Sequence, residues 1–363
     1  MLIKLLESLL ERVPGPLPRR PSLTDAVEDS ADAVERLTAE HVLALGGARH
    51  SLKEVARLAG VPVEEVRHLW RAMGFADVAD DARFFTGADV AALTQLRRLL
   101  DAELLDRDVV AQLARTAGRS MSRVAEAQVA ALRDDAERAN PPSTGGELAL
   151  EMVSRADRLV PAVEGLLTYS WRRHLAAALG RTLYRPGAED SDERALTVGF
   201  ADLVGFTALS QRLDIRELAA TVDRFENVAY AVAAGQGGRV VKVIGDEVMF
   251  VADEPAAAGR MALELPERCE HEGLPNVRVG LACGPALAWE GDYLGPTVNL
   301  ASRLAAVADP GTVLVSEAIR DELAGDPAFD VQAVRARRLK GLGRTPSYVL
   351  RPSVVPAALR GRG

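Results

Sequence analysis

Apolar residues follow two different spacings along the chain, and the change between them predicts two domains. From residue 51 to residue 183, apolar positions recur every three or four residues, which places them on one face of successive helices. From residue 195 onward, short runs rich in Val, Ile and Phe alternate with helical stretches. The acidic, Pro- and Gly-containing stretch 185–192 separates the two patterns. We therefore expect an all-α domain over residues 1–185 and a second domain over residues 193–352.

The helical half contains a motif near residues 51–74. Ser51 and Glu54 have the spacing of a capping box before a short helix, Gly60 supplies a turn, and Pro62 opens a second helix. This pattern predicts a helix-turn-helix, which resembles the first half of MerR-type DNA-binding domains.

The helix-turn-helix can serve DNA recognition or persist only as a packing unit. Glu64 and Glu65 stand in the first turn of its second helix, where a DNA reader presents its base contacts. The chain also has a formal net charge of −8, which argues against binding nucleic acid through overall charge. These acids argue against DNA binding.

The other helices of this half show no catalytic cluster. They are predicted over residues 1–10, 25–45, 86–135, 148–167 and 169–183. Stripes of Leu and Ala such as these usually form a core, although they can also line an apolar pocket for a lipid.

Composition limits the class of protein. Hydrophobic residues make up 48% and charged residues 26%, as in a soluble globular protein with sizeable cores. Cys269 and Cys283 are the only cysteines, which implies neither a zinc site nor a disulfide framework and fits a reducing compartment, the cytoplasm. No run approaches the roughly 18–20 apolar residues of a transmembrane segment. The apolar residues 1–10 include Lys4 and Glu7 and precede no cleavage site, so they do not predict a signal peptide.

The second domain alternates strands and helices. Strands are predicted at 195–200, 239–251 (a hairpin), 277–283 and 312–315 and near Leu339 and Tyr348, with helices at 214–234, 254–271, from 297, and to 323. The order is βααββαβ with additions. It predicts an α+β, ferredoxin-like fold in which helices cover one face of an antiparallel sheet.

The hairpin 239–251 carries two residues that its apolar strands do not require. Lys242 stands among valines, and Asp246 lies at the turn beside Gly245. Taken alone, they are an edge-strand lysine and a solvated turn. A turn carboxylate beside glycine can also present oxygen to a metal, and a strand lysine can meet a ligand.

Further polar residues make the chemical interpretation stronger. Asp202 follows the first strand and precedes a Gly-containing turn into a helix, whose amides suit a polyphosphate. With Asp246 it can hold Mg²⁺ or Mn²⁺, in the arrangement of two aspartates and two ions. Asn299 and Arg303 are four residues apart on one helix face, where they suit a ribose and a charged phosphoryl group.

These residues belong to motifs that resemble the catalytic domain of class III nucleotidyl cyclases over residues 193–352. The motifs are Phe200-Ala-Asp-Leu-Val-Gly-Phe-Thr207, Lys242-Val-Ile-Gly-Asp246, Asp292-Tyr-Leu-Gly-Pro-Thr-Val-Asn299-Leu-Ala-Ser-Arg303 and Leu339-Lys-Gly-Leu-Gly343. The family cyclises ATP by attack of the ribose 3′-hydroxyl on the α-phosphate, which releases pyrophosphate.

The resemblance implies a role for each matching residue. Asp202 and Asp246 would bind the two divalent cations. Lys242 and Asp292 would select the purine and favour ATP, since guanylyl cyclases tend to carry residues such as Glu and Cys there. The remaining residues are Asn299 and Arg303, which would act on the transition state, Lys340, which would bind the triphosphate, and Phe206 and Thr207, which would contact the nucleotide.

Family members act as dimers, and this chain carries residues for both halves of a site, so the resemblance implies a homodimer with two sites. The helical half resembles the regulatory region of actinobacterial cyclases, some of which respond to pH and bind fatty acids. The helix 169–183 would then be a switch, and His174 is either its proton sensor or an ordinary exposed histidine.

Two other functions are compatible with the sequence. The chain could be a transcription regulator whose cyclase-like domain senses a nucleotide, which would require the helix-turn-helix to bind DNA. It could also be a guanylyl cyclase, which the residues at 242 and 292 disfavour.

Overall fold

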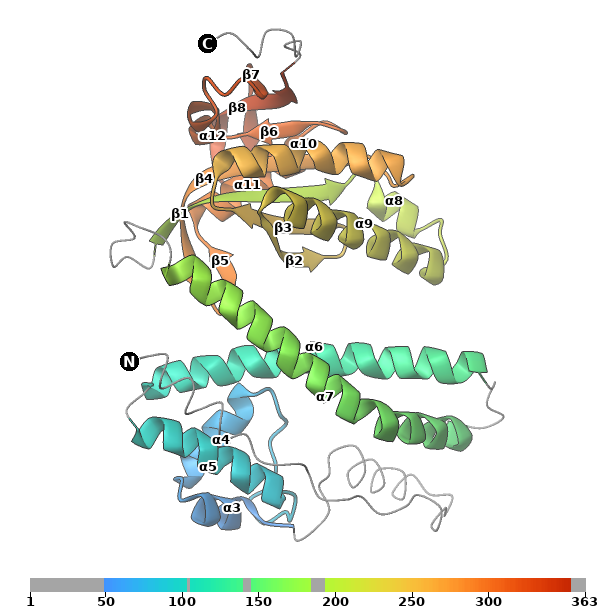
Figure 1. Cartoon of the computed structure of the whole chain (residues 1–363), viewed down its shortest axis with the longest axis vertical. Coiled ribbons are helices and arrows are strands. Elements are labelled where there is room, and N and C mark those ends of the chain that lie inside the picture. The colour runs from blue at the N-terminus through green and yellow to red at the C-terminus, as the bar shows by residue number, and fades with distance from the viewer. Residues whose placement is uncertain (1–48, 103–104, 140–144, 184–192, 354–363) are drawn as a thin grey trace. The chain divides into compact units, whose positions relative to one another are not determined.

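The computed structural model describes residues 49–102, 105–139, 145–183 and 193–353, which Figure 1 draws in colour. The helices predicted over residues 1–10 and 25–45 lie outside these ranges. The chain divides into two compact units, Met1–Arg185 and Pro186–Gly363. Each unit has a hydrophobic core of its own.

The described part of the first unit is built from helices. They are α3 (Leu52–Ala59), α4 (Val63–Ala72), α5 (Gly87–Asp101), α6 (Arg107–Ala139) and α7 (Gly145–Leu183). The predicted capping box is confirmed: the Glu54 amide donates to the Ser51 hydroxyl at 3.3 Å, and the Ser51 amide donates to the Glu54 carboxylate at 2.8 Å. Gly60 ends α3 with a φ of 66° and Pro62 precedes α4, so the helix-turn-helix is present.

Basic side chains of α4 are engaged within the helical unit. Arg67 pairs with Asp80 at 2.8 Å, and Arg71 pairs with Asp77 at 2.7 Å. Both acids lie in the segment that follows the helix, so the chain itself neutralises these cations. Cations that bind DNA must reach its phosphates, and in this structure Arg67 and Arg71 are paired within the chain.

The long helices differ from the predicted boundaries. The apolar stripe expected as one helix over residues 86–135 is divided between α5 and α6. The helices expected over 148–167 and 169–183 form one helix, α7, because only Thr168 separates them and it does not interrupt helical hydrogen bonding. His174 is exposed on the C-terminal part of α7. No helix that the structure describes combines the length and apolar character needed to cross a bilayer.

The second unit is an α+β domain. Its strands are β1 (Glu193–Leu203), β2 (Arg239–Ile244), β3 (Glu247–Ala252), β4 (Val277–Trp289), β5 (Asp292–Leu294), β6 (Val313–Val315), β7 (Phe329–Leu339) and β8 (Gly343–Pro352). Its helices are α8 (Phe206–Ser210), α9 (Ile215–Gln236), α10 (Pro255–His271), α11 (Pro296–Val307) and α12 (Glu317–Glu322). The sheet order is β2-β3-β1-β4-β6-β8-β7, with β5 paired to β4. The predicted βααββαβ arrangement is therefore confirmed in β1 to β4 with α8 to α10.

Helices cover both faces of the sheet, so the prediction of a single covered face was wrong. Leu203 of β1 belongs to the core with α9 and α10, whereas Phe200 belongs to a second core with Ala301 and Ala305 of α11. The backbone of α11 packs closely against β4 because residue 280 of β4 is glycine. An added Cβ at Gly280 would lie 2.2 Å from the Ala305 amide nitrogen. In addition, β4 and β6 pair in parallel.

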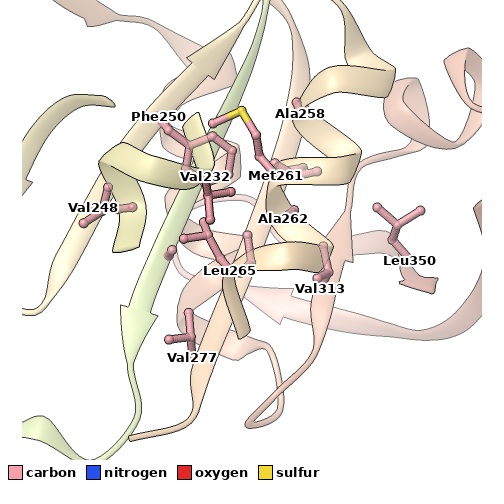
Figure 2. Close-up of a cluster of buried hydrophobic side chains, with 14 of the residues drawn as sticks. Val232, Val248, Phe250, Ala258, Met261, Ala262, Leu265, Val277, Val313 and Leu350 are labelled. Atoms are coloured by element: carbon pink, nitrogen blue, oxygen red, sulfur yellow. The ribbon is translucent and has the colours of Figure 1, made fainter. Parts of the chain in front are cut away.

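The larger core lies between the sheet and helices α9 and α10 (Figure 2). Val232 of α9, Phe250 of β3 and Met261 of α10 are each 1% exposed, and Val277 of β4 is 0% exposed. Burial of each such side chain contributes about 1.5–3 kcal/mol relative to exposure. This core holds the ends of β1, β3 and β4 together, and those ends carry the charged residues described below.

The two cysteines differ in burial. Cys269 of α10 is 0% exposed, and burial raises the pKa of its thiol to about 12, whereas Cys283 of β4 is half-buried. Because the thiolate is the reactive form, we expect iodoacetamide at about pH 8 to modify Cys283 and to reach Cys269 only after unfolding. Mass spectrometry of the digested protein measures this difference. Equal modification of both thiols in the folded protein would contradict it.

Candidate active site

Two aspartates lie beside each other where β1 meets the β2–β3 hairpin. Asp202 is the penultimate residue of β1, so it belongs to the strand rather than following it. Asp246 occupies the hairpin turn after Gly245, whose φ of 62° suits glycine. The Leu203 amide donates to the Asp246 carbonyl at 3.1 Å, which fixes the turn against the end of β1.

An arginine from β4 holds the first of these aspartates. The Arg278 guanidinium donates to Oδ2 of Asp202 through Nε at 2.6 Å, and its Nη2 lies 2.5 Å from the same oxygen. Its Nη1 donates to the carbonyl of Ala306 in α11 at 3.0 Å. Arg278 is not among the residues predicted from the sequence, although a single charged residue in the apolar strand at 277–283 is the same kind of signal as Lys242 among valines.

The side chains of Asp202, Asp246 and Glu247 interact with one another, so a nearby positive charge would stabilise their ionised forms. Burial raises the pKa of Asp246, and the charge of Asp202 and a side-chain hydrogen bond with it add to the rise, while the backbone amide of Asp246 and Arg278 oppose it. Burial and the same two aspartates also raise the pKa of Glu247. Carboxylate oxygens are suitable ligands for Mg²⁺ or Mn²⁺. Among the described residues, however, no three His, Cys, Asp or Glu side chains form a metal-binding group, so the two aspartates fit an ion that takes its other ligands elsewhere.

A second polar pair links β2 to β5. The Lys242 ammonium forms an ion pair with Oδ2 of Asp292, and the side chains are 30% and 35% exposed. The other oxygen of Asp292 accepts a hydrogen bond from the Tyr293 amide at 2.7 Å. The structure thus brings together Lys242 and Asp292, the two residues proposed from sequence to select the purine.

The polar residues of α11 are exposed. Asn299 and Arg303 lie one turn apart on this helix, as predicted. Within the part of the chain that the structure describes, neither side chain has a hydrogen bond or an ion pair with Asp202 or Asp246.

The last three predicted residues lie in two other places. Lys340 is exposed in the turn between β7 and β8. Phe206 and Thr207 begin α8, a helix of five residues that follows Gly205. Phe206 packs against the larger core and Thr207 is exposed, so Thr207 is the more accessible of the two to a ligand.

Known proteins match both units. Residues 189–352 match the family model of the adenylate and guanylate cyclase catalytic domain, and residues 20–176 match the adenylate cyclase regulatory domain. A Streptomyces coelicolor protein named adenylate cyclase is 41% identical over 300 residues, which cover 81% of this chain and 78% of that protein. A Mycobacterium tuberculosis protein named pH-sensitive adenylate cyclase is 31% identical over 323 residues, which cover 84% and 79%.

Among solved structures, the catalytic core of a rhodopsin-guanylyl cyclase with converted specificity, in complex with ATPαS, matches with 27% identity and a TM-score of 0.41. The match covers 44% of this chain and 96% of that one. The family assignment comes from the sequence relatives, because the 41% identity to the Streptomyces protein extends through both units. This chain belongs to the adenylate cyclase family.

Proposed function

We propose that two copies of this chain convert ATP to 3′,5′-cyclic AMP and pyrophosphate at two sites that each copy completes for the other. The observation that carries this proposal is that the two groups of polar residues do not contact each other within the described part of one chain. Asp202 and Asp246 have no hydrogen bond or ion pair to Asn299 or Arg303 in the described residues. All of them suit one reaction, and a second copy can bring them together.

In this reaction the ribose 3′-oxygen forms a bond to the α-phosphorus, and the bond from that phosphorus to the bridging oxygen of pyrophosphate breaks. The hydroxyl proton leaves to solvent. Asp202 and Asp246 would hold Mg²⁺ or Mn²⁺, which would lower the pKa of the attacking hydroxyl and offset the charge of the leaving group. Asn299 would orient the ribose, and the Arg303 guanidinium would stabilise the charge on the phosphoryl group.

Base selection would rest on the half-buried pair at β2 and β5. Lys242 can donate to N1 of adenine, and Asp292 can accept from the exocyclic amine. Guanine presents a donor at N1 and an acceptor at O6. The Lys242 donor would then face a donor, and the Asp292 acceptor would face an acceptor. The exposed Lys340 would then bind the triphosphate, and Phe206 and Thr207 at the start of α8 would contact the nucleotide.

Exposed apolar side chains near the proposed site support association of two copies. Ile244 at the end of β2 is 57% exposed, Trp289 at the end of β4 is 48% exposed, and Leu294 of β5 is 47% exposed. Large apolar side chains of this kind are typical of surfaces that a partner covers.

The decisive experiment combines two inactive variants. Asp246→Ala and Asn299→Ala chains should each lose cyclic AMP formation, while co-expression should recover about a quarter of the wild-type activity, because mixed dimers contain one intact site. Cyclic AMP from ATP with Mn²⁺ is measured for each preparation, and cyclic GMP from GTP is measured in parallel. Mixtures as inactive as their components would refute the shared site, and no product from the wild type would refute the enzyme assignment.

The helical unit contains a cavity that supports a regulatory ligand. It has a volume of about 660 Å³ and an apolar lining that includes Met73, Leu96, Leu99, Leu113 and Met121. Ser122 and Glu126 of α6 are polar members of the lining. A fatty acid has the apolar chain and polar end that suit this cavity. The helix-turn-helix would act here as a packing unit rather than as a DNA reader.

Regulation can be tested on the full-length chain. We expect oleate to change cyclic AMP formation, and we expect Leu113→Glu to remove the response because a charge in the lining disfavours an alkyl chain. The relative named pH-sensitive supports measuring each rate across pH, with His174→Gln as the variant for the proposed proton sensor. A rate indifferent to oleate and to pH would remove this regulatory proposal.

A further inference from the structure

An irregularity in β2 determines where its two basic side chains lie. Arg239 and Lys242 are three residues apart, so a regular strand would place them on opposite faces of the sheet. The pairing with β3 shifts between Val240 and Lys242, which inserts Val241 as an extra residue. A bulge of this kind re-aims the side chains that follow it.

Packing around β2 agrees with this change of direction. Val240 and Val243 pack against the core that contains α9 and α10. Val241 packs against the other core, on the face covered by α11, and Tyr293 packs there too. Since Arg239 alternates with Val240, and Lys242 with Val243, both basic side chains lie on the α11 face.

Both basic side chains contact β5. Lys242 forms the ion pair with Asp292. The Arg239 guanidinium donates to the Tyr293 hydroxyl, and its central carbon lies 5.4 Å from the centre of that ring. The Tyr293 amide holds Oδ1 of Asp292 at 2.7 Å, which leaves Oδ2 to Lys242. Arg239 therefore acts on Asp292 through a single intervening residue.

The strand that carries this pair needs such support. β5 consists of three residues, and among the described strands it pairs with the end of β4 alone, through Leu287, Ala288 and Trp289. It is not a hydrogen-bonded neighbour of β2 in the sheet. The spacing between Lys242 and Asp292 is thus set by side chains rather than by a shared backbone ladder.

We propose that Arg239 and Tyr293 are positioning residues for purine selection, and that they hold Asp292 at the distance from Lys242 that distinguishes adenine from guanine. This inference rests on the base-selecting role proposed above for Lys242 and Asp292. The cation above the ring and the hydroxyl hydrogen bond fix Tyr293, and its amide then fixes the carboxylate. Arg239 and Tyr293 need not touch the nucleotide.

The test measures kcat and KM for ATP and GTP in full-length Arg239→Met and Tyr293→Phe variants. We expect the ratio of kcat/KM for ATP to that for GTP to fall about tenfold in Arg239→Met and less in Tyr293→Phe, which keeps the ring. The change should appear mainly in the KM for ATP, since the groups at the reacting phosphorus are untouched. The double variant should lose little more than Arg239→Met, because both residues act through one contact.

A second Arg–Tyr pair in the same unit provides the control. The Arg320 guanidinium donates to the Tyr348 hydroxyl and lies 4.6 Å from the ring centre, between α12 and β8. Arg320→Met and Tyr348→Phe should leave the ATP-to-GTP ratio unchanged, whatever they do to the melting temperature. A comparable fall of the ratio in these controls would show that general loosening explains the effect, and would overturn the proposal.

Lys242→Gln separates failure of this inference from failure of the proposed function. If Lys242→Gln leaves the ratio unchanged, the base-selecting pair itself is wrong. If Lys242→Gln lowers the ratio but Arg239→Met and Tyr293→Phe do not, only the positioning role is overturned. Should Arg239→Met fail to fold, Tyr293→Phe alone decides, because it removes one hydroxyl and retains the packing of the ring.

Discussion

Replacing Asp202 by asparagine is expected to lower Mn²⁺-dependent cyclic AMP formation by about 10³-fold, since metal ions contribute several kcal/mol of transition-state stabilisation and each 1.36 kcal/mol is a factor of ten. The substitution keeps the size of the side chain but removes its charge. It also leaves the Arg278 guanidinium without its carboxylate partner at 2.6 Å, so a cation remains where the metal should bind. Affinity for Mn²⁺ should therefore fall together with turnover.

Two measurements are needed, because loss of activity alone does not identify a metal ligand. Calorimetric titration of the full-length chain with Mn²⁺ should show a clear loss of binding in Asp202→Asn. Asp309→Asn is a matched control: Asp309 also pairs with an arginine, Arg337 at 2.9 Å, but lies beyond the end of α11. The control should bind Mn²⁺ and turn over ATP like the wild type. An Asp202→Asn variant with wild-type Mn²⁺ affinity would refute the metal assignment.

The hairpin was predictable because the residues that specify it are adjacent in the sequence. Two β-branched runs meet at Gly245-Asp246, and the structure confirms β2, the turn and β3 at these positions. The bulge at Val241 was not predictable, because one extra valine among valines does not visibly change the alternation of apolar and polar residues. The consequence reaches the site, since the bulge places Arg239 on the same face as Lys242.

Contacts across the sheet were the harder part of the site. Lys242 and Asp292 were paired from the sequence through the resemblance to cyclases, and the ion pair brings these residues together. Arg278 was missed because its partner, Asp202, is 76 residues away in the sequence. The two residues lie opposite each other only because of the register in which β1 pairs with β4. The available signal was a single charged residue in an apolar strand. Its partner can be identified only from the register of β1 and β4.

The second covered face also escaped prediction for a physical reason. The buried residues of α11 toward β4 include Ala301 and Ala305, which form a weaker apolar stripe than Leu or Val would. The packing depends on close approach of the backbones, and Gly280 in β4 permits it. A glycine inside a strand indicates such an approach, but it does not say which element comes near.

That close approach leads to the second large effect, at Gly280. An alanine Cβ there would lie 2.2 Å from the amide nitrogen of Ala305 and 2.3 Å from the carbonyl oxygen of Ala301. Both are backbone atoms of α11, so no rotamer change relieves the contact and the helix must move. We expect Gly280→Ala to lower the free energy of unfolding by about 3 kcal/mol, at the upper end of typical overpacking costs. For a domain of this size that corresponds to a fall in Tm of roughly 10 °C.

The same displacement should impair turnover in the protein that remains folded. α11 carries Asn299 and Arg303, and a shift of about 1 Å in groups that orient a substrate costs on the order of 10²-fold in rate. Thermal denaturation and the cyclic AMP rate at a temperature where the variant is folded measure the two effects separately. Gly235→Ala in α9 is the control, because a Cβ there meets nothing within 4 Å and alanine favours a helix by up to about 1 kcal/mol. Gly235→Ala should be as stable as the wild type or more so, with full activity. If Gly280→Ala had the same Tm as the wild type, the contact between α11 and β4 would not be the constraint that positions Asn299 and Arg303.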